Sequence, residues 1–82
     1  MRFVPGDPHK HSLAARGLDF ETIIQEITTN GVKMTYRNPR YPDQLVVVAE
    51  ILGYTHCIAC EPVRDGWRII TAWPSRKHHH NQ

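Results

Sequence analysis

The chain of 82 residues has few cysteines and no long apolar segment, and each scarcity excludes a class of protein. Its two cysteines, Cys57 and Cys60, are too few for the disulfide scaffold that stabilises most secreted domains of this size. The longest apolar run extends only from Leu45 to Ala49, which is too short to cross a bilayer. The chain does not begin with the basic and then apolar segments of a signal peptide. We therefore expect a cytoplasmic domain that does not contact membranes.

An excess of charge of either sign is also missing. Ten Lys and Arg residues stand against eight Asp and Glu residues, which gives a formal net charge of +2 at pH 7. This balance excludes a strongly basic, histone-like binder, so the placement of the cations matters more than their number. Most of the cations are Arg, whose planar guanidinium favours paired contacts to phosphate or carboxylate groups.

The familiar motifs of nucleotide and cofactor chemistry are missing as well. The chain contains no P-loop, no G-x-G-x-x-G, no Ser-x-x-Lys motif and no pair of carboxylates placed for a cleft. Cys57 and Cys60 form a lone C-x-x-C, and residues three apart on a strand point to opposite faces. We therefore expect two buried thiols rather than a metal or redox site, and no cofactor. Any catalysis is expected to use Arg, Lys, His and Tyr side chains without a metal.

The N-terminal part of the chain predicts a short strand and two helices. Residues 2–4 are typical of an edge strand, because Pro5-Gly6 follows them. A short helix is expected over residues 8–16, with Gly17 at its end. A second helix is expected between the N-cap Asp19 and Asn30-Gly31. Its apolar side chains recur at the spacing of one buried stripe and are Phe20, Ile23, Ile24 and Ile27.

Beyond the helices the apolar pattern changes to that of strands. Residues 44–52 are apolar on both faces, so this strand is expected in the interior of the sheet. Arg64-Asp65-Gly66 is expected to form a hairpin turn. Trp67 and Trp73, six residues apart on one strand, are expected to point to the same face and pack against the helices, with base stacking as the alternative. The expected strands are residues 32–36, 44–52, 55–61 and 67–73.

These elements predict one α+β domain over residues 1–77, followed by a polar, His-rich tail over residues 78–82 that is expected to be disordered. Two N-terminal helices are expected to pack on one face of a mostly antiparallel sheet of four to five strands, because each helix has a single apolar stripe. The other face of the sheet is left largely uncovered. We expect a ligand or partner to bind on that face.

Three segments form a pattern whose order and spacing are more specific than any one of them. They are Arg16-Gly17-Leu18-Asp19-Phe20-Glu21, then Arg40-Tyr41-Pro42-Asp43-Gln44 with the following strand, and finally Pro74-Ser75-Arg76-Lys77. In this combination the chain resembles the BrnT-like toxins of type II toxin–antitoxin systems, which have a RelE-like fold. The resemblance extends from Lys10 to Lys77. The family often continues into a further basic helix, whereas this chain continues with three histidines.

The resemblance implies a toxin that acts as a metal-independent endoribonuclease on mRNA, inhibits translation and is neutralised by a cognate antitoxin protein. In such a reaction the 2′-hydroxyl attacks the adjacent phosphate and leaves a cyclic phosphate and a 5′-hydroxyl. The protein must orient the strand, move a proton and stabilise charge on the phosphate. The alternative is a non-catalytic module of the same fold, a degenerate toxin, that binds RNA or a protein.

Four residues are predicted to take part in catalysis. Arg76 and Lys77 follow the last strand and can stabilise charge on a phosphate. The alternative for this pair is a basic terminus that is exposed to solvent and has no role in catalysis. His11 can accept or donate a proton, and an ordinary polar helix face is the alternative for it. Tyr41 is the second candidate for proton transfer.

Five further cations are predicted to bind RNA. Arg37 and Arg40 lie beside Tyr41 in a loop with two prolines, where Arg can hold a phosphate and Tyr can stack on a base; in the alternative, the loop is merely stiff and Tyr41 packs on the core. Arg68 either faces the uncovered side of the sheet or forms a cross-strand pair with Glu61. The complete predicted set is Lys10, Arg16, Arg37, Arg40 and Arg68.

Overall fold

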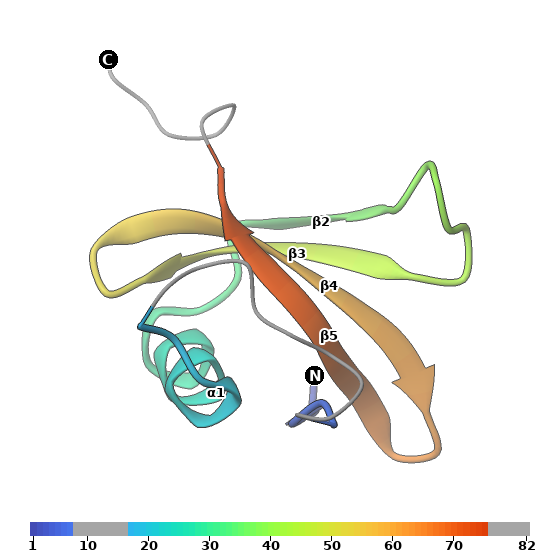
Figure 1. The fold of residues 1–82 in the computed structure, drawn as a ribbon, viewed down its shortest axis with the longest axis horizontal. Coiled ribbons are helices and arrows are strands. Elements are labelled where there is room, and N and C mark those ends of the chain that lie inside the picture. Colours follow the sequence, from blue (N-terminus) through green and yellow to red (C-terminus); the bar gives the residue numbers. More distant parts are fainter. Residues whose placement is uncertain (8–16, 76–82) are drawn as a thin grey trace.

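The computed structural model describes residues 1–7 and 17–75, and in this part of the chain one helix packs on one five-stranded sheet (Figure 1). The predicted α+β class is therefore confirmed. The predicted first helix, over residues 8–16, lies outside the described residues. The elements are β1 (Phe3–Val4), α1 (Phe20–Asn30), β2 (Met34–Arg37), β3 (Leu45–Ile51), β4 (Tyr54–Val63) and β5 (Gly66–Pro74).

The sheet has the strand order β1-β5-β4-β3-β2. Strands β2 to β5 form an antiparallel meander, and β1 pairs with β5 in parallel at one edge, so the sheet is mixed. The prediction of a mostly antiparallel sheet is confirmed. Strand β3 lies between β2 and β4, in agreement with its apolar character on both faces.

The turn between β4 and β5 is shorter than predicted. Val63 pairs with Gly66, so Arg64 and Asp65 alone form the turn and Gly66 is the first residue of β5. A Cβ atom at Gly66 would lie 2.5 Å from the carbonyl oxygen of Arg2. Glycine is therefore needed here because β1 approaches the turn closely, rather than for the turn itself.

Helix α1 forms where its caps and its apolar stripe predict it. The Asp19 side chain accepts the Thr22 N–H at 2.7 Å, and this hydrogen bond lowers the pKa of Asp19. Gly31 ends the helix with a φ of 83°. Ile23 and Ile27 are buried against β3 and its neighbours, so α1 covers one face of the sheet.

The two faces of the sheet have separate apolar clusters. On the face covered by α1, the helix residues pack with a set that includes Val47, Ile58 and Cys60. We call the opposite side the open face. Its cluster consists of Val46, Val48 and Cys57, with Tyr36 and Trp73 packed against it. Cys57 and Cys60 thus lie on opposite faces as predicted.

A β-bulge changes the direction of the last strand. Ala59 pairs with Thr71 and the next residue, Cys60, pairs with Ile69, so Ile70 is an extra residue on β5. One extra residue reverses the alternation of all side chains that follow it. Trp67 consequently packs on the covered face and Trp73 on the open face. The prediction that both tryptophans point the same way was wrong for this reason.

The turn between β3 and β4 contains a residue in an unfavourable backbone conformation. Leu52 and Gly53 join Ile51 to its cross-strand partner Tyr54, and their φ angles are 51° and 85°. Two positive φ angles are typical of a type I′ turn, which favours Asn-Gly over a branched residue. The Glu26 carboxylate of α1 accepts the Leu52 N–H at 2.8 Å and holds this turn against the helix.

Replacement of Leu52 by Asn should stabilise the domain. The leucine side chain is 57% exposed, so little apolar burial is lost, whereas Asn adopts positive φ more readily. We expect Leu52→Asn to raise the free energy of unfolding by about 0.5–1 kcal/mol in urea titrations. Leu52→Ala lacks the short polar side chain that can hydrogen-bond to the local backbone at positive φ, so it should give no gain. A Leu52→Asn protein less stable than Leu52→Ala would contradict this account of the turn.

Candidate nucleic-acid interface

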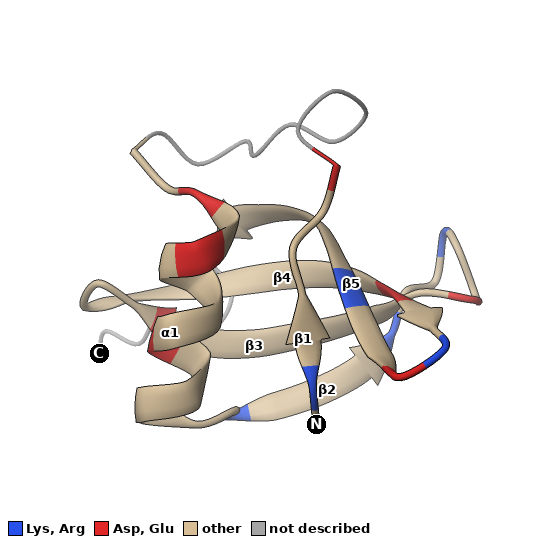
Figure 2. Cartoon of the chain, turned by 90° about the horizontal axis from the view of Figure 1, so that it is seen from below, with Lys and Arg blue, Asp and Glu red and all other residues tan. Residues whose placement is uncertain are grey.

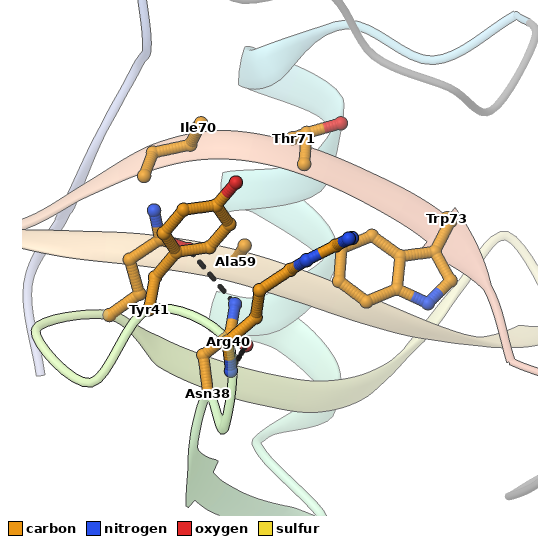
Figure 3. Close-up of a pocket in the computed structure, with 8 residues that line it drawn as sticks. Asn38, Arg40, Tyr41, Ala59, Ile70, Thr71 and Trp73 are labelled. Atoms are coloured by element: carbon orange, nitrogen blue, oxygen red, sulfur yellow. Dashed lines mark hydrogen bonds between the residues drawn. The ribbon is translucent and has the colours of Figure 1, made fainter.

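The open face carries a groove of about 480 Å³ between the loop that follows β2 and the second half of β5. Figure 3 shows how the loop and strand side chains converge on it. The floor comes from β4 and β5, and the polar wall comes from the loop. The residues that matter for its chemistry are Arg40, Tyr41, Gln44, Ile70, Thr71 and Trp73.

Hydrogen bonds within the loop fix the shape of the polar wall. Asn38 and Gln44 bond through a backbone N–H to carbonyl contact of 3.0 Å and through their side-chain amides at 3.1 Å. The Asn38 side chain also accepts the Arg40 N–H at 3.0 Å. Arg37 donates to the carbonyl oxygen of Pro42 at 2.8 Å. The loop is thus closed at its base, as expected of a stiff loop, and Arg37 braces it without lining the groove.

Arg40 and Tyr41 lie at the mouth of the groove. The Arg40 side chain extends toward the Trp73 indole, and the Tyr41 ring is directed toward Ile70 and Thr71 on β5 (Figure 3). Tyr41 is 54% exposed, which rules out the alternative that it packs into the core. Within the described part of the chain, the Arg40 guanidinium makes no salt bridge. A guanidinium beside two accessible aromatic rings can contact both a phosphate and a base.

Arg68 has the partner that the sequence suggested as one of two alternatives. It is the register partner of Glu61 on β4, and its guanidinium lies 3.3 Å from the Glu61 carboxylate. Both side chains are partly exposed, so the pair contributes little to stability. The ion pair is confirmed and reduces the positive charge that Arg68 offers to a ligand.

Five of the nine predicted site residues fall outside residues 1–7 and 17–75, and their predicted roles stay predictions. Among the other four, the structure brings Arg40 and Tyr41 together in the groove and gives Arg37 and Arg68 structural partners. Sequence reasoning placed Trp73 on the wrong face because the bulge at Ile70 has no sequence signal that we recognised. The residues outside the described part are Lys10, His11, Arg16, Arg76 and Lys77.

The helix is acidic, whereas the sheet and its loops carry cations together with acidic residues such as Glu50 and Glu61. Helix α1 carries Glu21 and Glu26 and contains no Lys or Arg, whereas the described cations lie on the strands and their loops (Figure 2). An anionic ligand is therefore repelled by the helix side and meets Arg40 on the open face. The distribution supports an anion-binding role for the open face despite the small net charge.

The apolar cluster of the open face places a phenol next to a thiol. The Tyr36 hydroxyl lies 3.9 Å from the Cys57 sulfur. Burial, with a further contribution from this hydrogen bond, raises the pKa of Tyr36. The groove below Arg40 has its own apolar lining, Ala59, Ile70 and Trp73, which suits the flat face of a nucleobase better than a second charged group.

Other classes of site receive no support from the described residues. In residues 1–7 and 17–75, no group of three or more His, Cys, Asp and Glu side chains is placed to hold a metal ion. The single helix of this part is too short to span a membrane. Comparisons with protein-family models, curated proteins and solved structures found no match.

The thiols provide a test of the two-faced sheet. Burial raises the pKa of Cys60 to about 12, so its reactive thiolate is scarce at pH 8. We expect iodoacetamide to alkylate Cys60 in the native protein at least about 100-fold more slowly than in guanidinium chloride. Peptide mass spectrometry measures the rate for each cysteine separately. Rapid native labelling of Cys60, or a disulfide between the two cysteines, would contradict the assigned burial.

Proposed function

We propose that this chain is the RNA-cleaving toxin of a toxin–antitoxin pair and that it binds single-stranded RNA on the open face of its sheet. The observation that supports this function best is the groove in which Arg40, Tyr41 and Trp73 converge. Aromatic rings stack on unpaired bases of any sequence, and a guanidinium contacts the phosphate between them. The acidic α1 on the opposite side favours this face over the rest of the domain.

The geometry favours single strands over duplexes. Trp73 is half-buried at the groove floor and Tyr41 lies at its mouth, so a base must leave a helical stack to reach both rings. Bases in an A-form duplex are stacked inside the helix and do not offer their flat faces to a protein. An unpaired base does not have to break base pairs with a partner strand, so it enters the groove more easily.

The proposal of cleavage rests on the family resemblance and on Arg40, the cation that the described residues place at the groove. The 2′-hydroxyl of the bound strand attacks the adjacent phosphate, and cationic side chains stabilise the charge that develops there. By resemblance, Arg76, Lys77, His11 and Tyr41 take part, mRNA is the substrate, and a cognate antitoxin blocks the same face. The reaction proceeds without a metal, so it is expected to survive EDTA.

Substitutions of matched charge test the binding face. Arg40→Ala should weaken the binding of a labelled single-stranded RNA about fivefold and make the salt dependence shallower by about 0.7 in log–log slope, because one phosphate contact is lost. Arg64→Ala removes the same charge from the exposed β4–β5 turn and should change the dissociation constant less than twofold. Fluorescence anisotropy at several salt concentrations measures both. Equal losses in the two variants would point to unspecific attraction instead.

Binding without cleavage is the second candidate function. One observation favours it: the described lining of the groove contains no carboxylate and no imidazole to move a proton. Incubation of RNA with the purified chain in EDTA separates the two functions. The nuclease should yield fragments with cyclic phosphate and 5′-hydroxyl ends and should arrest growth when expressed. A chain with Arg76→Ala and Lys77→Ala should do neither, whereas intact RNA with the unaltered chain would favour the binding module.

A further inference from the structure

A second polar cluster lies on the open face, outside the groove, and consists of Lys33, Glu50 and Thr55. The Lys33 ammonium lies 2.8 Å from a Glu50 carboxylate oxygen, and the Thr55 hydroxyl donates to the same oxygen at 2.5 Å. The Lys33 ammonium also lies 3.5 Å from the Thr55 hydroxyl. Thr55 is only 4% exposed, whereas the side chains of Lys33 and Glu50 are 50% and 35% exposed. A buried hydroxyl therefore positions a carboxylate that solvent and ligands can reach.

The strand register places this cluster next to the groove. Glu50 pairs with Thr55, and the neighbouring row of the same face contains Val48, Cys57 and Trp73. Two residues along a strand span about 7 Å, and Trp73 lies two strand spacings, about 10 Å, from Val48. The Ser75 N–H donates to the carbonyl oxygen of Thr55 at 3.0 Å, so β5 leaves the sheet beside the cluster. A nucleotide whose base stacks on Trp73 can extend its ribose and neighbouring phosphate along the open face toward this cluster.

The cluster of Lys33, Glu50 and Thr55 contributes too little to the stability of the fold to explain its presence by stability alone. An ion pair with half-exposed partners contributes little to folding. Glu61, the carboxylate at the other end of the open face, lies four residues along β4 from Cys57, the strand partner of Trp73. Thr55, the partner of Glu50, lies two residues from Cys57. Glu50 is thus the carboxylate that the described strands place near the base-stacking residue Trp73. Glu50 supplies a carboxylate, a group that can accept a proton and that the described groove lining does not contain.

On the premise of the proposed function, we propose that Glu50 accepts the proton of the attacking 2′-hydroxyl and that Lys33 binds the phosphate that is attacked. The 2′ oxygen forms a bond to phosphorus as its proton passes to the Glu50 carboxylate. The bond from phosphorus to the 5′ oxygen breaks, and water supplies the proton that this leaving oxygen takes. Glu50 then returns its proton to solvent, so the step is balanced without a metal or a further reactant.

The ion pair in the free protein fits these roles. In the free protein the Lys33 ammonium lies against the Glu50 carboxylate at 2.8 Å. The incoming phosphate competes for the Lys33 ammonium and weakens its ion pair with Glu50, so that the carboxylate can accept a proton while the Thr55 hydroxyl keeps it in place. The titratable groups near this hairpin also include His56 on β4, whose Nδ1 lies 2.9 Å from the Tyr54 carbonyl oxygen, and Glu26 on α1, whose carboxylate accepts the Leu52 N–H and the Asn30 amide.

The test compares Glu50→Gln with Glu21→Gln, which removes the same charge from the exposed surface of α1. Single-turnover cleavage of a labelled single-stranded RNA in EDTA should slow at least about 100-fold in Glu50→Gln, a general-base effect, and less than twofold in Glu21→Gln. RNA affinity should be unchanged or higher in Glu50→Gln, because a negative charge is lost from the binding face. The wild-type rate should rise with pH along an acid limb that Glu50→Gln lacks.

A shorter carboxylate separates a chemical role from a structural one. Glu50→Asp should cleave more slowly than the wild type and keep the acid limb, whereas full activity or loss of the limb in this variant contradicts the assignment. Lys33→Ala should lose both affinity and rate. If the wild type cleaves RNA and a folded Glu50→Gln cleaves it equally fast, the role of Glu50 is wrong and the nuclease function stands. If the wild type binds RNA without cleaving it, the nuclease function fails and this inference fails with it.

Discussion

The extra residue that Ile70 adds to β5 determines what the open face presents. Without the bulge, Trp73 would alternate onto the same face as Trp67 and would pack under α1. With it, the strand delivers an indole to the uncovered side of the sheet, opposite the loop that carries Arg40 and Tyr41. Bulges often redirect side chains next to functional sites in this way. The groove, its aromatic floor and the proposed path of RNA all depend on this one-residue shift in register.

The single described helix covers only one face of the sheet, and the bulge directs Trp73 to the other face. Because α1 has one apolar stripe, it buries one sheet face and leaves the other to be closed by its own side chains. Val46, Val48 and Cys57 are nevertheless buried, since Tyr36 and Trp73 pack across them. The open face is therefore a packed apolar surface with polar groups at its margins. Such a surface receives a flat base without first rearranging, which lowers the cost of binding.

Local patterns predicted most of the fold correctly. The helix from Asp19 to Gly31 and the meander from β2 to β5 follow from capping residues and from periodicities that each element carries by itself. The bulge was missed because an unpaired residue in a strand arises from the match between two strands. The role of Gly66 was missed for a similar reason, since its constraint comes from Arg2, which is distant in sequence.

In the candidate site, too, the residues of a single segment were predicted and those brought together by several segments were not. Arg40 and Tyr41 were predicted from the composition of one loop, and that loop does carry them to the groove. The cluster of Lys33, Glu50 and Thr55 was not predicted, because its members come from three segments that only the sheet register brings together. Arg68 was assigned to RNA although Glu61 already stood opposite it. The sequence offered the pair of Arg68 with Glu61 only as an alternative, and the register of the strands decided for it.

Two single-tryptophan proteins test the central claim most directly. Trp67→Phe leaves Trp73 on the open face as the only indole, and Trp73→Phe leaves Trp67 on the covered face. Titration with single-stranded RNA should quench the fluorescence of Trp73, because a base stacks on its ring, and should leave that of Trp67 unchanged. Quenching of Trp67 alone, or of neither indole at RNA concentrations that saturate binding, would contradict an RNA site on the open face.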